Sequence, residues 1–356
     1  MMSDLPRDLL EERLSRVPVK SLREARFTCK NWKTLSKKRS FTKKHLAQEA
    51  TSRESEFKVV MVLHCKVYLT SINLRGIHNG FDPSINRQAK LVSLNGTDLI
   101  DISEVYHCDG YEKRKSNLRY KVLRFVDFAE EEFVEYEIYE LKSNSWRVLD
   151  VTSDWEVEFY ARGVSLKGNT YWFATDKFPE ISTNLIHSVY FLLCFNFTSE
   201  RFGPRLPLPF YPMDVDTVSL SSVREEQLAV LFQRKDNLHM EIWVTTNIEP
   251  EEVMWSKLFL AVDMQPLTDF KFGIADASFI IDEEKKVVVV FAKDKDVMYP
   301  TRNTAYIIGE DGYYKEVDLG KTTDKIRDPL VCSYVPSSAQ IKQGGKRKKK
   351  GKLITD

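Results

Sequence analysis

Residues 139–149 read YELKSNSWRVL, and this stretch indicates how the larger part of the chain folds. It consists of an apolar strand, a polar turn, and then an aromatic and a basic residue that open a second strand. Ser and Asn between two runs of aromatic and aliphatic residues are typical of a turn between antiparallel strands. The stretch therefore predicts a pair of adjacent β-strands.

The same order of features recurs three more times along the chain. The recurrences cover residues 194–203, 242–258 and 306–317. Their marker aromatics, with that of the first stretch, are Trp146, Phe202, Trp255 and Tyr314, which lie 56, 53 and 59 residues apart. A near-constant period of this size in a β-rich sequence predicts the blades of a propeller. Ordinary hairpins of a β-sandwich are the alternative that the period alone leaves open.

Residues 51–341 carry β signals almost throughout. The strand-like runs are Phe57–Leu69, Tyr120–Phe128, Phe133–Leu141, Gln227–Phe232, Glu241–Thr245 and Val287–Phe291. Gly168-Asn169 and Asp311-Gly312 each lie between two apolar runs and predict hairpin turns. Prolines alternate with Leu, Phe and Tyr over residues 204–212. This alternation predicts the connection between two blades, with an extended recognition segment as the alternative.

Residues 1–50 carry helical signals instead. Asp4 as an N-cap and Pro6 in the first turn open a segment with apolar residues at positions 9, 10, 14 and 17. Ser21 and Glu24 form a capping box in front of a second apolar stripe. A third short helix is expected after Ser40. Because so small a helical unit cannot bury all these stripes by itself, we expect it to bind a partner surface.

The formal net charge of +1 over 356 residues hides three unlike parts. Residues 1–50 hold 13 basic and 6 acidic side chains, a net of +7, and residues 342–356 hold 7 and 1, a net of +6. Residues 51–341 hold 33 and 45, a net of −12, and a body of that charge repels nucleic acid. Five scattered cysteines and the lack of a long apolar run predict a protein of the nucleus or cytoplasm with no membrane partner.

The chain carries no pattern of a catalytic or metal site. Its six histidines show no HExxH motif and no pair spaced four residues apart. His107-Cys108-Asp109 resembles a catalytic row, but neighbours on a strand point to opposite faces and cannot form a nucleophile–base contact. We therefore expect no catalytic residue, no cofactor and no metal. An enzyme on a kelch-like propeller is the alternative, and it requires a cluster of such side chains in the central channel.

A run of basic residues lies close to the C-terminus. It consists of Lys346, Arg347, Lys348, Lys349, Lys350 and Lys352. Like charges at this density predict a solvated, disordered tail. We expect a nuclear localisation signal, with an inert solubilising tail as the main alternative and nucleic-acid binding as a third. No aromatic residue is interleaved with the basic ones, which argues against stacking on bases.

The helical head resembles an F-box along its whole span. The matching segments are LPRDLLEE at 5–12, LSRVP at 14–18, SL at 21–22, TCKNW at 28–32 and FTKKHL at 41–46. The resemblance implies docking on a Skp-type adaptor, and through it assembly with cullin and RING subunits. The adaptor-binding set that it implies is Leu5, Pro6, Leu9, Leu10, Leu14, Val17, Pro18, Leu22, Cys29 and Trp32. Each of these could instead hold the three helices together, because both roles require the same apolar side chain.

The β body resembles the F-box-associated domain of the large plant family, which is a kelch-like propeller. The resemblance rests on residues 139–149, 163–172, 195–204, 241–246 and 329–337. It implies a non-catalytic receptor subunit of a Skp-cullin-F-box type ubiquitin ligase, whose β domain binds an unidentified target protein for ubiquitylation. A degenerate paralogue or kelch-like binding module that no longer assembles a ligase is the alternative.

The chain departs from the family pattern in two regions. Arg13, Ala25 and Phe27 stand where the F-box pattern has an aliphatic residue, a Leu and a small polar residue. After Tyr111, only residues 112–119 replace a hydrophobic strand and a W-N-P segment of the family pattern. We therefore expect about one blade to be missing and an edge strand to be exposed.

The sequence as a whole predicts an α+β protein in three parts. A three-helix F-box occupies residues 1–50, an all-β propeller-like domain that lacks about one blade occupies residues 51–341, and a disordered basic tail occupies residues 342–356.

Overall fold

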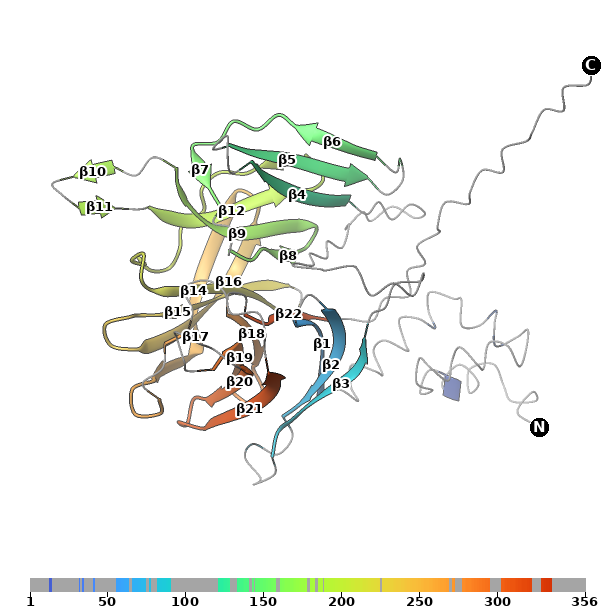
Figure 1. The fold of residues 1–356 in the computed structure, drawn as a ribbon, viewed down its shortest axis with the longest axis vertical. Coiled ribbons are helices and arrows are strands. Elements are labelled where there is room, and N and C mark those ends of the chain that lie inside the picture. Colours follow the sequence, from blue (N-terminus) through green and yellow to red (C-terminus); the bar gives the residue numbers. More distant parts are fainter. Residues whose placement is uncertain are drawn as a thin grey trace, which may run out of the picture. The chain divides into compact units, whose positions relative to one another are not determined.

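The computed structural model shows a domain built from antiparallel β-sheets (Figure 1). The chain divides into two units, and Phe57–Ser333 form the β unit. The structure describes residues 13, 14, 32, 34, 41 and 56–334, the latter with gaps at 64–65, 75–76, 78–81, 91–120, 129–132, 141–142, 144, 158–160, 178–179, 183–184, 188, 225, 269–270, 273–276, 295–301 and 322–327. The expected F-box helices therefore lie outside the described residues, apart from five positions that are helical.

Among the described residues, five sheets form the blades of a propeller, so the predicted propeller architecture is confirmed. Blade 1 has the order β22-β1-β2-β3, with strands β22 (Leu330–Ser333), β1 (Glu56–Leu63), β2 (Lys66–Asn73) and β3 (Ser84–Lys90). Blade 2 consists of β4 (Lys121–Phe128), β5 (Phe133–Glu140) and β6 (Ser145–Leu149). The predicted single run Phe57–Leu69 is wrong, because it contains parts of two strands, β1 and β2.

The remaining sheets follow in chain order. Blade 3 contains β7 (Trp155–Glu156), β8 (Val164–Leu166), β9 (Asn169–Asp176), β12 (Tyr190–Asn196) and β13 (Arg201–Phe202), and a separate hairpin is formed by β10 (Glu180–Ser182) and β11 (Leu185–His187). Blade 4 consists of β14 (Thr217–Val223), β15 (Gln227–Gln233), β16 (His239–Glu249) and β17 (Glu252–Asp263). Blade 5 consists of β18 (Ser278–Asp282), β19 (Val287–Lys293), β20 (Arg302–Gly309) and β21 (Tyr314–Lys321).

The marker aromatics of the sequence repeat occupy equivalent places in the fold. They lie on β6, β13, β17 and β21, which are the last strands of blades 2, 3, 4 and 5. The turn predicted at Gly168-Asn169 lies one residue earlier, because Asn169 already pairs with Leu166 as the first residue of β9. Lys167 and Gly168 have φ angles of 51° and 81° between β8 and β9, the left-handed pair that a two-residue hairpin turn requires. The repeat therefore marks one complete structural unit per period.

Strands that are apolar along their whole length belong to blades that are covered on both faces. Successive side chains of such a strand point to opposite faces of the sheet, and each face packs on a neighbouring blade. Strand β19 reads VVVVFAK and is buried along its whole length. Val288 and Val290 pack into the core shared with blade 4, and Val287 and Val289 pack into the core shared with blade 1. Similar cores join blades 3 and 4 and blades 2 and 3. Continuous apolar runs thus predict strands with a blade on each side.

Blade 1 is closed by strands from the two ends of the domain. Strand β22 pairs antiparallel to β1, with Val59 opposite Ser333 and Val62 opposite Leu330. The last strand along the chain therefore becomes the first strand of the first blade. Glu56 and Ser333 consequently lie at one face of the propeller, which we call the closure face.

The opposite face, which we call the connector face, carries the segments that lead from one blade to the next. Hydrogen bonds from Thr217 and Ser221 on β14 reach the carbonyl oxygens of Phe272 and Phe279 at 2.7 and 2.6 Å, so the first strands of blades 4 and 5 run in the same direction. Because β14 begins where the connector from blade 3 ends, that connector lies opposite the closure face.

Among the described residues, the ring of cores is interrupted between blades 1 and 2. No hydrophobic core among the described residues joins these two blades. Blade 2 has three strands, and in the described part of the chain β4 has a strand neighbour on one side only. The position after Tyr111, where the sequence predicts missing residues, lies between β3 and β4 and outside the described residues. No helix in the described part of the chain is long and apolar enough to span a bilayer.

Candidate functional site

The connector between blades 3 and 4 presents large apolar side chains to solvent. It runs from β13 to β14 over residues 203–216. Leu206 and Phe210 are buried and anchor the segment, and Phe210 stacks on Phe232 with ring centroids 4.0 Å apart. Tyr211 and Met213, in contrast, are 96% and 69% exposed. The predicted connection between blades is therefore correct, and the same segment also offers apolar contact area.

The connector is fixed by hydrogen bonds to both neighbouring blades. The Leu206 amide and carbonyl exchange hydrogen bonds of 2.9 Å with those of Leu192 on β12. The Trp255 indole N–H of blade 4 donates to the Pro207 carbonyl oxygen at 2.9 Å. The prolines limit the conformations of the segment further, because each fixes its own φ angle. The exposed side chains are thus held on a rigid base.

A pocket of about 290 Å³ opens beside these side chains. It is lined by Met213, Val215, Asp216, Arg234, Lys235 and Asp236. The first three belong to the connector and the last three to the turn after β15, so two segments about 20 residues apart in sequence form one site. A pocket at the lower end of the usual range for ligand sites fits one side chain better than a whole cofactor.

The carboxylates near the pocket are engaged by the protein itself. Asp216 is buried and accepts hydrogen bonds of 3.0 Å from the amides of Met213 and Lys235. Asp214 accepts a hydrogen bond of 2.7 Å from the Tyr190 hydroxyl. Desolvation by burial lowers the pKa of Lys271, whose ammonium group donates to the Val215 carbonyl oxygen.

Exposed charges of both signs lie at the pocket rim. Arg234 and Lys235 are both exposed, and the Arg234 guanidinium lies 5.5 Å from the centroid of the Phe232 ring. Asp236 is the exposed carboxylate of the same turn. With Asp214, which is also exposed, two cations face two carboxylates, so the exposed charges around the pocket balance.

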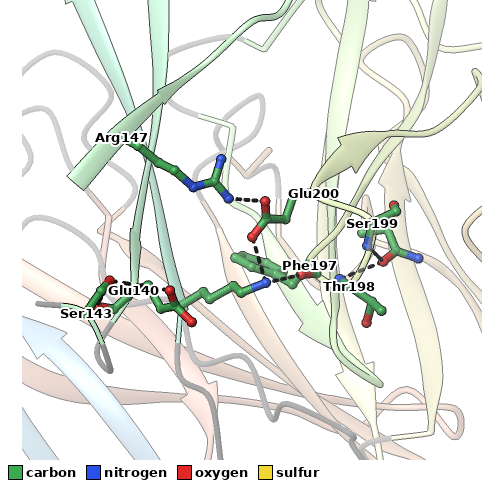
Figure 2. A network of polar contacts seen from close by, with 9 residues as sticks. Glu140, Ser143, Arg147, Phe197, Thr198, Ser199 and Glu200 are labelled. Carbon is green, nitrogen blue, oxygen red and sulfur yellow. Dashed lines mark hydrogen bonds and ion pairs between the residues drawn. The ribbon is translucent and has the colours of Figure 1, made fainter. Parts of the chain in front are cut away.

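A second polar cluster joins blades 2 and 3 (Figure 2). Glu200, at the turn between β12 and β13, forms an ion pair of 2.7 Å with Lys121 of β4 and a second ion pair with Arg147 of β6. Lys121 also donates to the Phe197 carbonyl oxygen at 2.9 Å. Asn196 shapes the turn by accepting hydrogen bonds from the amides of Thr198 and Ser199. This cluster links blades 2 and 3, and its side chains are not placed as a nucleophile and a base would be.

The described residues include a buried cysteine, and its pKa is shifted by that burial. Burial raises the pKa of the Cys194 thiol to about 12, so this cysteine is not a nucleophile at neutral pH. No group of three or more His, Cys, Asp or Glu in the described part of the chain is placed to hold a metal ion. His107, Cys108 and Asp109 lie outside the described residues.

Most residues of the expected adaptor-binding set also lie outside the described residues, and so does the basic tail. Two members are described: Leu14 is buried and Trp32 is half-buried, both in helical conformation. Arg13, one of the departures from the F-box pattern, is exposed. The adaptor-binding role of the set stays a prediction.

The pocket residues could not be found from the sequence. Arg234, Lys235 and Asp236 read as ordinary turn charges, and nothing in the sequence pairs them with Met213 and Val215. The available signal was the end of the proline-rich connector, where Tyr211 and Met213 add apolar residues that no strand pattern requires. Such residues are either core or contact surface, and only the fold distinguishes the two.

Two protein families match this chain. The family described as F-box associated beta propeller domain matches residues 58–111 and 110–341. The family described as F-box domain matches residues 2–44. The two parts of the propeller match meet at residues 110–111, the position after which the sequence predicts missing residues.

Similar proteins occur in Arabidopsis thaliana. One relative, named as an F-box protein, is 88% identical over 398 aligned residues that cover 100% of both chains. An F-box/kelch-repeat protein is 48% identical and covers 96% of this chain and 99% of its own length. Another F-box protein is 45% identical with the same coverage. Because the first alignment has 398 positions and this chain has 356 residues, at least 42 positions, the difference, have no counterpart here.

Proposed function

This chain belongs to the family of F-box proteins with an F-box associated β-propeller domain, and on that premise we propose that it is the substrate-recognition subunit of a Skp-cullin-F-box type ubiquitin ligase. The F-box docks on a Skp-type adaptor, and through it the chain joins cullin and RING subunits. The propeller binds a target protein. The chain itself is not an enzyme, because ubiquitin transfer takes place on the other subunits.

One observation carries this proposal: an F-box match at residues 2–44 is joined to a propeller whose connector face exposes Tyr211 and Met213 beside a pocket. Large exposed apolar residues on a rigid scaffold are typical of protein-binding surfaces. Helical segments with unsatisfied apolar stripes suit docking on a helical partner.

The physical role of such a receptor is to raise the local concentration of the target protein near the charged ubiquitin carrier. Binding the target through the propeller and the ligase through the F-box makes the encounter between a target lysine and the charged ubiquitin carrier effectively intramolecular. The chain needs rigid geometry for this role and no reactive group of its own. We propose the nucleus as its place of action, through the basic residues 346–352.

Binding to a purified Skp-type adaptor tests the proposal. We expect the full-length protein to retain the adaptor at micromolar concentration, and Leu9→Asp and Pro6→Ala/Leu10→Ala to lose it, because buried apolar anchors carry most of the energy of such an interface. Met254→Asp is a matched control, since Met254 is a 53% exposed residue of blade 4 outside the F-box. If the wild-type protein retains no adaptor, the receptor proposal is wrong.

The departure at Arg13 can be tested in the same assay. Arg13→Ile should tighten adaptor binding if the charge opposes docking, and unchanged affinity would show that the exposed side chain is accommodated. A second candidate function is a binding module that no longer assembles a ligase. The shortened region near residue 111 favours it, and a folded protein that binds no adaptor would be its signature.

A further inference from the structure

The methionines of the β unit divide into two groups by exposure. Met213 on the connector and Met254 on β17 are 69% and 53% exposed. The other three methionines of the described residues, Met61, Met240 and Met264, are fully buried in the cores between blades. Because a dissolved oxidant must reach the sulfur of a thioether to react with it, exposure divides these five side chains into reactive and protected ones.

Met213 differs from Met254 in its surroundings. Together with Val215 it forms the apolar part of the pocket of about 290 Å³, whereas Met254 does not line this pocket. The N–H donors of Arg234 and Lys235 line the same pocket. A sulfoxide oxygen accepts hydrogen bonds, so the pocket holds donors for the oxidised form of Met213. Since a sulfoxide carries no net charge, the balance of cations and carboxylates around the pocket does not oppose it.

The backbone at Met213 is fixed without any contribution from the sulfur. The Asp216 amide donates to the Met213 carbonyl oxygen at 2.9 Å, and the Met213 amide donates to the Asp216 carboxylate at 3.0 Å. The same carboxylate accepts a hydrogen bond of 3.0 Å from the Lys235 amide. A chemical change at the sulfur therefore leaves the turn and the pocket in place.

We propose that Met213 is a site of reversible oxidation by hydrogen peroxide. The sulfur attacks one peroxide oxygen, and an S–O bond forms while the O–O bond breaks. The departing hydroxide takes up the proton of the transferred oxygen and leaves as water, so the sulfur loses the two electrons that the peroxide gains. The product replaces the apolar thioether of the pocket by a polar sulfoxide, and reduction restores it. This inference goes beyond the proposed function and does not depend on it.

Peptide mapping by mass spectrometry, after timed exposure of the full-length protein to hydrogen peroxide, tests the proposal. We expect Met213 to become the sulfoxide at least about tenfold faster than Met61, Met240 and Met264, because a buried side chain reacts only when the fold opens. Methionine sulfoxide reductase with a thiol should return Met213 to the reduced form. The thermal unfolding midpoint should stay at the wild-type value while Met213 is oxidised, because this side chain is exposed.

Hydrophobic interaction chromatography measures the effect on the connector face. Peroxide should shorten the retention time of the wild-type protein, and Met213→Leu should reduce this shift, because leucine stays apolar and carries no sulfur. Met254→Leu is the matched control, since it removes an exposed methionine outside the pocket. Adding Met213→Leu to this control should reduce the shift further.

Three results would overturn the proposal. The first is oxidation of Met213 at the rate of the buried methionines, and the second is a sulfoxide that forms only as the protein unfolds. The third is a retention shift that is the same with and without Met213→Leu. Failure of adaptor binding leaves all three measurements unaffected, because the adaptor is expected to bind residues 1–50.

Discussion

Glu200 illustrates how single residues hold neighbouring blades together. It lies at the turn between β12 and β13 with a φ angle of 55°, a conformation that non-glycine residues rarely adopt. Its carboxylate accepts from Lys121 and Arg147, which come from two different strands of blade 2. Two ion pairs from one carboxylate thus join blade 3 to the first and last strands of blade 2.

The pKa of Glu200 predicts how this contact depends on pH. Desolvation by burial acts to raise the pKa, but the hydrogen bonds and charges of Lys121 and Arg147 together outweigh it, so the pKa is lower than usual. A carboxylate whose pKa is lower in the folded state stabilises the fold above its unfolded pKa of about 4.3, and this contribution is lost as the pH falls through the folded pKa.

We therefore expect Glu200→Gln to lower the free energy of unfolding by about 1 kcal/mol near pH 7, the upper range for partly exposed pairs, and by less near pH 3. Urea denaturation at several pH values measures the difference. Glu310→Gln removes an exposed ion pair with Lys286 and serves as control, with a smaller expected effect. A difference between wild type and Glu200→Gln that does not shrink in acid would contradict this account.

Blade 2 is the element that departs most from its neighbours. One face of its sheet packs on blade 3 through Leu123 and Ile138, which contact Trp172 and Phe195. On the opposite face of the sheet, cross-strand registers place Val122, Tyr139 and Trp146 in one row. Val122 and Trp146 are 45% and 42% exposed there. In a closed ring, both faces of a blade are covered by neighbouring blades, so this exposed face marks the interruption between blades 1 and 2 in the described part of the chain.

Two tryptophans of the same size test whether that face is uncovered. Trp146→Ala should lower the free energy of unfolding by about 1 kcal/mol or less, because the ring contacts Tyr139 and Arg124 and remains 42% exposed. Trp172→Ala should cost about 3–5 kcal/mol, because Trp172 is buried between blades 2 and 3. Chemical denaturation monitored by far-UV circular dichroism measures both, and equal costs would mean that another part of the chain covers Trp146.

At the scale of the whole β unit, Arg162 connects three blades. It precedes β8 of blade 3, and its guanidinium donates to the Ser278 hydroxyl at 2.7 Å and to the carbonyl oxygens of Asp328 and Pro329 at 2.7 and 2.8 Å. Ser278 begins blade 5, and residues 328–329 lead into β22 of blade 1. Blades 3, 5 and 1 are thus linked through the planar guanidinium group of Arg162.

We expect Arg162→Ala to lower the free energy of unfolding by about 2–4 kcal/mol, since it removes three hydrogen bonds from a charged donor to partly buried acceptors. Arg162→Lys should recover only part of the loss, because an ammonium group cannot reproduce the planar fork. The matched control is Arg224→Ala, which removes one ion pair with Glu283 at the surface and should cost less than about 1 kcal/mol.

Equilibrium urea unfolding measures these differences. A free energy of unfolding for Arg162→Ala within about 0.5 kcal/mol of the wild-type value would show that the shared cores alone fix the arrangement of the blades.

The strand content and its repeat could be predicted because they depend on local patterns. Apolar runs such as residues 287–291 require a strand with two buried faces, and Lys167-Gly168 and Asp311-Gly312 lie at turns that favour glycine. Element boundaries were less well determined. The run Phe57–Leu69 divides into β1 and β2, because its residues remain apolar on both sides of the break.

The sequence by itself determined the propeller, its period, the connector between blades 3 and 4 and the family of the chain, because each of these leaves a pattern among residues close together in the chain. Only the tertiary structure decided that β22 completes blade 1, that no core of the described residues joins blades 1 and 2, and that Met213 meets Lys235 across a pocket. These facts depend on which blade faces which, and side chains that meet across blades share no spacing along the chain.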